Sequence, residues 1–207
     1  MPKVEVPRKS IYRLSIYQRC LIRLIENEVE TVSSEALASA AGVKSTQLRK
    51  DLTYFGQFGT RGLGYNVKAL SGVLNDVLGT TSYQAVILVG VGNLGSALLR
   101  YKGFNKEGFE IAAAFDLAPT RERRTEGASV PVFPADNMCD FIRNHQVRMA
   151  IIAVPSEAAQ NVVNDLVESG VQAILNFSPT VLQVPDNVTV NNVDLALELE
   201  NLSYFIR

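Results

Sequence analysis

The spacing of apolar residues changes once along the chain, near residue 80. Before that point they recur every three or four residues, which is typical of amphipathic helices. This pattern predicts four helices, at residues 9–27, 34–41, 47–55 and 67–78. The front of the chain, residues 1–79, is therefore expected to be a small helical domain.

From residue 84 onward, short continuous apolar runs alternate with helical segments. Apolar runs of about four to eight residues are typical of strands buried in a parallel sheet. They occur at residues 85–90, 110–116, 130–133, 149–154 and 172–177. The alternation predicts an α/β fold with a doubly wound parallel sheet over residues 84–191, and residues 79–83 form the junction.

The last residues, 192–207, form a third predicted region, a terminal helix that Asn192 or Asp194 can cap. This segment is more apolar than a surface helix usually is. It packs either on its own domain or on a partner, and we favour the partner.

In the front domain, the second and third helices are joined by a short turn that contains Gly42, which is typical of a helix-turn-helix. Ser33 or Ser34 can cap the second helix, and Ser45 or Thr46 the third. The third helix begins with donors suited to phosphates and base edges, namely Ser45, Thr46, Gln47, Arg49 and Lys50. The alternative is a plain three-helix bundle with a solvated basic face.

Residues 56–65 argue for DNA binding, because they carry four glycines in nine residues around one arginine. A glycine-rich hairpin with Arg61 at its tip contributes little to a core but can enter a narrow minor groove. Arg61, Gly62 and Tyr65 are the predicted DNA contacts of this segment, which makes the domain a winged helix. A phosphate-binding glycine loop is the competing interpretation, but no Gly-Lys-Ser/Thr follows.

The apolar run at residues 85–90 leads into a glycine fingerprint and a helix. The fingerprint is Gly90-Val91-Gly92-Asn93-Leu94-Gly95, and Asp116 ends the next run 21 residues later. Gly90 permits the tight turn, Gly92 lets the backbone approach a pyrophosphate, Gly95 allows close helix–strand packing, and the acid accepts from a ribose hydroxyl. The pattern predicts a Rossmann-like dinucleotide site; a structural glycine turn is the alternative.

The residues after Asp116 bear on which dinucleotide binds. Arg121, Arg123 and Arg124 could sense a 2′-phosphate, but Asp116 would repel one, so NAD(H) is favoured over NADP(H). A solvated loop is the more ordinary explanation of the arginines. Ligands of such sheets bind at the carboxyl ends of the strands, where Val154, Pro155, Ser178 and Pro179 are expected beside the nicotinamide.

A dehydrogenase also needs a proton donor or acceptor beside the hydride centre. The single histidine, His145, precedes a strand and is expected at the amino edge of the sheet. Lys102 and Lys106 stand in no Tyr-x-x-x-Lys arrangement, and no separate substrate domain is present. We expect a sensor with no catalytic residue; the alternative is an NAD-dependent oxidoreductase whose N-terminal helices only dimerise.

Charge and composition sharpen this picture. The net charge of −1 hides a split, because residues 1–75 carry +5 and the remaining residues −6. A basic front half favours a nucleic-acid partner. No apolar stretch reaches the ~18 residues that span a bilayer, and the N-terminus is not a signal peptide, so a cytoplasmic protein is expected. Cys20 and Cys139 suggest neither a disulfide framework nor a metal site. Both are expected to be buried, and a redox-active thiol pair is the alternative.

Residues 47–65 together with the fingerprint at 90–95 closely resemble the Rex family of bacterial redox-sensing transcriptional repressors. The resemblance extends over nearly the whole chain, including residues 176–182 and 192–194. It implies a homodimer that senses the NADH/NAD⁺ ratio and binds pseudo-palindromic operator DNA when NADH is scarce. It also implies that NADH binding releases the operator, and that 192–207 is a domain-swapped helix.

The resemblance further implies roles for individual residues. Arg49 and Lys50 would lie on the major-groove helix, and Arg61 in the minor-groove wing. Tyr101 would lie near the nicotinamide, linked in the NADH state to Arg19 of the front domain and Asp194 of the other copy's swapped helix. Many members carry an aromatic residue after that aspartate, whereas this chain has Leu195, which would make the nicotinamide contact either weaker or purely aliphatic.

Overall fold

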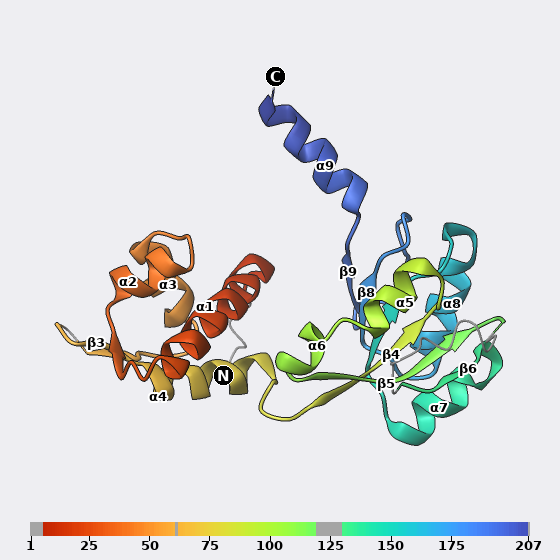
Figure 1. Ribbon diagram of the computed structural model, residues 1–207, viewed down its shortest axis with the longest axis horizontal. Coiled ribbons are helices and arrows are strands. Elements are labelled where there is room, and N and C mark those ends of the chain that lie inside the picture. The colour runs from red at the N-terminus through yellow and green to blue at the C-terminus, as the bar shows by residue number, and fades with distance from the viewer. Residues whose placement is uncertain (1–5, 61, 119–129, 207) are drawn as a thin grey trace. The chain divides into compact units, whose positions relative to one another are not determined.

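The computed structural model describes residues 6–60, 62–118 and 130–206 of the chain (Figure 1). The chain divides into two compact units, Met1–Ser82 and Tyr83–Arg207. We describe each unit by itself, the first as the front unit and the second as the sheet unit. Among the described residues, no helix is long and apolar enough to cross a membrane.

The front unit is built from helices with a small antiparallel sheet. Its helices are α1 (Arg8–Glu26), α2 (Ser34–Ala40), α3 (Ser45–Thr53) and α4 (Val67–Leu78). Its strands are β1 (Thr31–Val32), β2 (Gly59–Thr60) and β3 (Gly64–Asn66), in the order β1-β3-β2. The four predicted helices and the glycine-rich hairpin are therefore present, and β2 and β3 form the wing.

A side-chain cap marks the start of α2 but not that of α3. Ser33 caps α2, since its Oγ accepts the N–H of Ala36 at 3.0 Å. Gly42, which follows the end of α2, has φ +67°. The expected cap of α3 by Ser45 or Thr46 is wrong, because the N-cap is Lys44 and no side chain bonds there. Both residues are helical; Thr46 is exposed, and Ser45 Oγ accepts from Arg49 Nη2 at 3.3 Å.

Strand β1 was not predicted from the sequence. It is two residues long, and Val32 pairs with Tyr65 of β3. A Cβ on Gly64 would overlap the carbonyl oxygen of Val32, so only glycine allows the two strands to approach this closely. Two residues are too few to show an alternating pattern, which explains why the sequence does not reveal β1.

The sheet unit contains a parallel sheet of six strands. The strands are β4 (Gln84–Val89), β5 (Phe109–Asp116), β6 (Val132–Pro134), β7 (Met149–Ile152), β8 (Ala173–Asn176) and β9 (Thr189–Asn192). Their order is β6-β5-β4-β7-β8-β9, and every pair is parallel. Counted along the chain this is the order 3-2-1-4-5-6 of the Rossmann fold, which confirms the predicted fold class.

Helices pack on both faces of this sheet (Figure 1). They are α5 (Asn93–Leu99), α6 (Gly103–Lys106), α7 (Met138–His145) after a short 3₁₀ turn (Ala135–Asn137), and α8 (Ser156–Glu168). Ile87 of β4 lies in one core with residues of α7 and α8. Its neighbour Leu88 lies in another core, with Leu99 of α5. Successive side chains of the strand therefore serve opposite faces.

The end of the chain differs from the sequence prediction. Strand β9 precedes the terminal helix α9 (Leu195–Ser203), which is followed by a 3₁₀ turn (Tyr204–Ile206). Asp194 caps α9 through Oδ1, which accepts from Ala196 and Leu197. Strand β9 was missed because it lies at the sheet edge and is mostly polar, so its sequence shows no apolar run.

Candidate functional site

The loop between β4 and α5 requires glycine at two of its three fingerprint positions. Gly90 has φ +93°, and a Cβ there would lie 2.6 Å from the carbonyl oxygen of Ala153 after β7. A Cβ on Gly95 would overlap the carbonyl oxygen of Gly90. At Gly92 a Cβ would meet nothing within 4 Å. The structure itself therefore has no need of glycine at 92, which leaves an open backbone surface for a ligand.

Asp116 holds this loop from the end of β5. Its Oδ2 accepts the N–H of Val91 at 2.7 Å, and its Oδ1 accepts the N–H of Ala118 at 2.9 Å. Asp116 lies at the carboxyl end of β5, where the acid of a dinucleotide-binding fold accepts from a ribose hydroxyl. One side chain can thus fix the glycine loop and contact a sugar bound against it.

A cavity of about 1000 Å³ lies at the carboxyl ends of the strands, where the strand order reverses between β4 and β7. The predicted cofactor residues that line it are Gly90, Gly92, Leu94, Asp116, Val154 and Pro155. Reversal points of this kind are where open α/β sheets bind dinucleotides. The cap of α5 is Gly92 with no side-chain bond, so the first N–H groups of that helix remain available to a pyrophosphate. The residues present therefore fit a dinucleotide.

The charges that line the cavity bear on which dinucleotide fits. Among the described lining residues the ionisable acids are Asp116, Asp136 and Asp165, and none is Lys or Arg. A 2′-phosphate placed among carboxylates without a cation would be repelled. The described part of the cavity thus favours NAD(H). Arg121, Arg123 and Arg124, the predicted alternative sensors, lie outside the described residues.

Asn176, at the end of β8, positions the loop that follows this strand beside the cavity. It is fully buried, and its Nδ2 donates to Asn192 Oδ1 at 2.9 Å and to the carbonyl oxygen of Ser178 at 3.1 Å. Ser178, also buried, donates from Oγ to the carbonyl oxygen of Val154 at 2.5 Å. These bonds tie the loop after β8 to the loop after β7. The signal of this role in the sequence is a polar residue that closes an apolar strand.

Several predicted cofactor residues do not line the cavity. Val91 is buried within the loop, Gly95 within α5 and Ser178 after β8, whereas Asn93 and Pro179 are exposed. Tyr101 is 61 % exposed, and its ring packs edge-on against Phe104 at 5.1 Å. The lining thus excludes Tyr101, and it excludes Asp194 as well.

The described cavity lining contains no His, Lys or Tyr side chain that could serve as an acid or base. The ring of His145 instead stacks on Phe141 at 4.0 Å at the end of α7. Helix α7 leads into the amino end of β7, so His145 lies at the opposite edge of the sheet, as predicted. Both cysteines were expected to be buried, which is wrong for Cys139, because it is only half-buried and lines the cavity. Cys20 is buried as expected, and burial raises the pKa of its thiol.

In the front unit, a buried carboxylate joins α3 to α1. Asp51 of α3 is fully buried and accepts from Arg13 Nε at 2.6 Å and Nη2 at 2.7 Å, and from the Tyr17 hydroxyl at 2.8 Å. Burial raises the pKa of Asp51, but hydrogen bonds, first of all from Arg13, outweigh this and lower it. The same bond raises the pKa of Arg13. This charge-assisted pair sets the position of α3.

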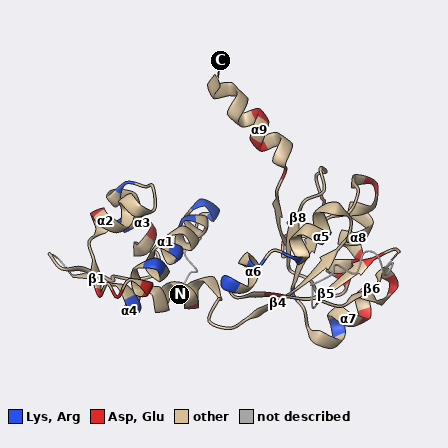
Figure 2. Cartoon of the chain, in the orientation of Figure 1, with Lys and Arg blue, Asp and Glu red and all other residues tan. Residues whose placement is uncertain are grey.

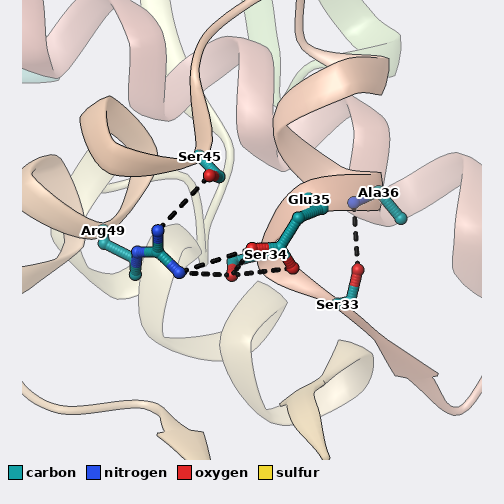
Figure 3. A network of polar contacts seen from close by, with 6 residues as sticks. All are labelled: Ser33, Ser34, Glu35, Ala36, Ser45 and Arg49. Carbon is teal, nitrogen blue, oxygen red and sulfur yellow. Dashed lines mark hydrogen bonds and ion pairs between the residues drawn. The ribbon is translucent and has the colours of Figure 1, made fainter. Parts of the chain in front are cut away.

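The predicted DNA-contacting residues of α3 differ in their surroundings. Thr46 and Lys50 are exposed. Gln47 instead donates to Asp51 Oδ1 at 2.9 Å, so it supports the anchor of α3. Arg49 is about half exposed and contacts Ser34, Glu35 and Ser45 (Figure 3). Basic positions of the front unit also lie on α1 and α4 (Figure 2).

The wing residues also differ from expectation. Tyr65 was expected to contact DNA, but it is 6 % exposed and belongs to the core of the front unit. A Cβ on Gly59 would lie 3.0 Å from its ring, which shows how closely β2 covers it. Gly62 is exposed in the turn between β2 and β3. Arg61 lies outside the described residues.

Known proteins resemble the chain along its whole length. Two family models match, "Putative DNA-binding protein N-terminus" over residues 5–53 and "CoA binding domain" over residues 81–180. The chain is 48 % identical to the redox-sensing transcriptional repressor Rex of Pelotomaculum thermopropionicum, over 99 % of this chain and 95 % of that protein.

Solved structures agree with this likeness. The crystal structure of RSP in complex with β-NAD⁺ and operator DNA matches with a TM-score of 0.89 and 37 % identity, over 99 % of this chain and 94 % of that one. RSP in complex with β-NADH matches with a TM-score of 0.84 and 35 % identity, over 99 % and 95 % of the two chains.

Proposed function

Because the chain belongs to the Rex family of redox-sensing transcriptional repressors, we propose that it represses transcription according to the NADH/NAD⁺ state of the cell. It binds operator DNA when NADH is low and releases the operator when NADH binds the sheet unit. It is a regulator and not an enzyme. NADH and NAD⁺ are its effector ligands, and its place of action is the cytoplasm, where bacterial operators lie.

One observation carries this proposal. A single chain joins a helix-turn-helix to a dinucleotide-type cavity whose described lining contains no His, Lys or Tyr side chain. The described lining residues can bind and orient a dinucleotide. Their titratable groups are the carboxylates of Asp116, Asp136 and Asp165 and the thiol of Cys139. The related protein RSP has been crystallised with both β-NAD⁺ and operator DNA. A dinucleotide that is bound but not turned over is suited to act as a signal.

We assign the binding of NAD(H) to residues around the cavity. The glycine loop, residues 90–95, would cradle the pyrophosphate with its backbone N–H groups, and Asp116 would accept from the ribose. Val154, Pro155, Ser178 and Pro179 would border the nicotinamide. Support comes from the cavity position and from the Ser178–Val154 bond, which holds the two loops together.

We assign DNA binding to α3 and the wing. Ser45, Thr46, Arg49 and Lys50 would face the major groove, and Arg61 and Gly62 the minor groove. Gln47 would support α3 through Asp51, and Tyr65 would support the wing from the core. A pseudo-palindromic operator requires two copies of the reading domain related by a two-fold axis. The protein is thus a homodimer in this proposal, with residues 1–79 reading DNA and residues 84–191 binding NAD(H).

We assign the pairing of the two copies to the terminal segment, residues 192–207. The leucines of α9 are 51–68 % exposed, which is unusual for an apolar helix that has no partner. In a swapped dimer this helix would pack against the other copy and bring Asp194 with it.

The switch we propose involves Arg19, Tyr101 and Asp194 of the other copy. These groups would pair only when reduced nicotinamide is bound, because the positive ring of NAD⁺ would disturb a cluster that already contains Arg19. Shifting a dimer from 1:99 to 99:1 in favour of the DNA-incompetent state takes about 5.5 kcal/mol of differential binding. Asp194 could accept from these groups through Oδ2, since both of its helix-capping bonds use Oδ1.

A mobility-shift assay tests the function. The DNA is a duplex enriched from a random pool by the unmodified chain, and the shift is measured with NADH, with NAD⁺ and with neither. Loss of the shifted band with NADH but not with NAD⁺ is expected. Failure to enrich any sequence, or consumption of NADH with small carbonyl compounds, would contradict the proposal.

The variant Asp194→Ala tests the switch separately. It should bind the duplex as the unmodified chain does, yet need much more NADH for release. Release at an unchanged NADH concentration would exclude Asp194 from the switch while leaving the repressor function intact.

A further inference from the structure

Three polar side chains from two helices hold the guanidinium of Arg49 (Figure 3). Its Nη1 lies 3.2 Å from Ser34 Oγ and 3.4 Å from Glu35 Oε1, and its Nη2 lies 3.3 Å from Ser45 Oγ. Ser34 and Glu35 begin α2, whereas Ser45 begins α3. The guanidinium therefore bridges the two helices of the helix-turn-helix.

Glu35 is itself held in place for this contact. Ser33 caps α2 through the N–H of Ala36, and Ser34 Oγ lies 3.3 Å from both carboxylate oxygens of Glu35. The pKa of Glu35 is lowered, first by the bond from its own backbone N–H and further by Ser34 and by the charge of Arg49. The carboxylate is thus ionised at neutral pH and stays beside the arginine.

Stability does not explain this pair. The side chains of Arg49 and Glu35 are 52 % and 68 % exposed. Exposed ion pairs of this kind contribute little to folding, because water screens the charges. The pair is better explained by what Arg49 does at the surface of α3.

The contacts leave one edge of the guanidinium open. Within the described part of the chain, Arg49 donates only from Nη1 and Nη2. The Nε–H therefore remains available, together with the second hydrogen of Nη2. Two parallel N–H groups of an arginine match O6 and N7 of guanine, whereas a mobile arginine binds any phosphate equally well.

We propose that Glu35 is a specificity-determining residue, which holds Arg49 in position to read a base and prevents it from binding phosphates indiscriminately. The inference rests on the proposed DNA-binding function. Glu35 acts in two ways: it restricts the guanidinium to one orientation, and its negative charge repels the DNA backbone wherever Arg49 finds no matching base. Affinity for DNA in general is thereby lowered more than affinity for the operator.

The variant Glu35→Gln tests this proposal, because it removes the charge and keeps the size of the side chain. Dissociation constants are measured by fluorescence anisotropy, on the full chain without NADH and over a range of salt concentrations. One duplex is enriched from a random pool by the unmodified chain, and the other is a scrambled version of it. The ratio of the two affinities should fall about threefold to fivefold, mainly because binding to the scrambled duplex tightens. The salt dependence of that binding should steepen by up to about one phosphate contact.

Two controls separate this role from a general effect of charge. Glu157 is the second residue of α8, as Glu35 is of α2, so Glu157→Gln makes the same charge change in the sheet unit and should leave the ratio unchanged. In an Arg49→Ala background, Glu35→Gln should alter both affinities equally. The unfolding midpoint should not change in the Glu35→Gln variant.

The proposal is overturned if Glu35→Gln leaves the ratio of the two affinities unchanged. It is also overturned if Glu35→Gln lowers this ratio as much in the Arg49→Ala background as in the unmodified chain. These outcomes differ from failure of the proposed function. If the unmodified chain enriches no sequence, the repressor function is contradicted and the role of Glu35 with it. If the chain enriches a sequence but the ratio of affinities does not respond to Glu35→Gln, only the proposed role of Glu35 in specificity is excluded.

Discussion

At the scale of single residues, the three fingerprint glycines are required for different reasons. Gly95 has no room for a side chain, because a Cβ there would overlap the carbonyl oxygen of Gly90. Gly92 has open space around it. A motif that looks uniform in sequence therefore contains two glycines demanded by the backbone and its packing, Gly90 and Gly95, and one, Gly92, for which we infer a ligand.

Alanine substitutions separate these two reasons. Gly95→Ala should lower the free energy of unfolding of the sheet unit by about 2 kcal/mol, as overpacking does in well-packed interiors. Gly92→Ala should leave that free energy unchanged but weaken NADH binding tenfold or more, about 1.4 kcal/mol. Urea denaturation and NADH fluorescence titration measure the two effects. Equal loss of stability in both variants would contradict this distinction.

Asp51 makes the stability of the front unit depend on pH. Its folded-state pKa is lowered, so its contribution is complete above the unfolded-state value of about 4 and is lost as the pH falls through the folded-state pKa. Asp51→Asn should cost about 3 kcal/mol at pH 7, because Arg13 loses its partner. The difference between the two proteins should shrink below about pH 4.

Far-UV circular dichroism during urea denaturation measures this effect at each pH. Asp76→Asn is the matched control, since Asp76 is exposed on α4. A constant difference between Asp51→Asn and the unmodified chain down to pH 2 would contradict the assignment.

At the scale of elements, α9 leaves its apolar side chains exposed among the residues that the structure describes. Leu195, Leu199 and Leu202 are 63 %, 68 % and 61 % exposed and follow one another at helical spacing along one side. A helix that exposes such a row packs on another chain more often than it stands alone. The terminal helix should therefore be part of the dimer interface.

Charged substitutions on that row test the interface. The double variant Leu199→Lys and Leu202→Lys should convert the dimer to a monomer at micromolar concentration. The control, Glu198→Gln with Glu200→Gln, changes the net charge equally on the same helix and should remain dimeric. Light scattering after size-exclusion chromatography distinguishes them. A dimer in both variants would place the interface elsewhere.

Elements also differ in how well the sequence predicts them. Helix α4 agrees with its predicted bounds, because a full apolar stripe, Asn66 at the cap and Gly79 at the end all specify it. Strands β1 and β9 were not predicted. Each is too short or too polar to show a pattern, and each exists because a neighbouring strand offers it hydrogen bonds.

At the scale of the whole molecule, the two units must be coupled for the proposed switch to work. Coupling between two binding sites is reciprocal, so operator DNA must weaken NADH binding by the factor by which NADH weakens operator binding. We expect the dissociation constant of NADH to rise when the enriched duplex is present, and not with scrambled DNA. Titration of NADH with each duplex measures this. An NADH dissociation constant that does not change with the enriched duplex would contradict coupling between the two sites.

The sequence by itself determined the two-part organisation, the fold class and the position of the glycine fingerprint. These depend on local patterns, namely apolar periodicity, caps and glycine spacing, which can be read from residues that are neighbours in the chain. The position of His145 could be inferred as well. It precedes strand β7, and chain direction therefore places it at the amino edge of the sheet, opposite the cavity.

Only the tertiary structure decided which side chains meet. The Asp51–Arg13 anchor, the Asn176 bonds and the Glu35 contact to Arg49 join residues that the sequence gives no reason to pair. It also placed Tyr65 in the core and turned Gln47 toward Asp51. The physical reason is that burial and hydrogen-bond partners depend on how separate elements pack, and packing is a property of the fold rather than of any local segment.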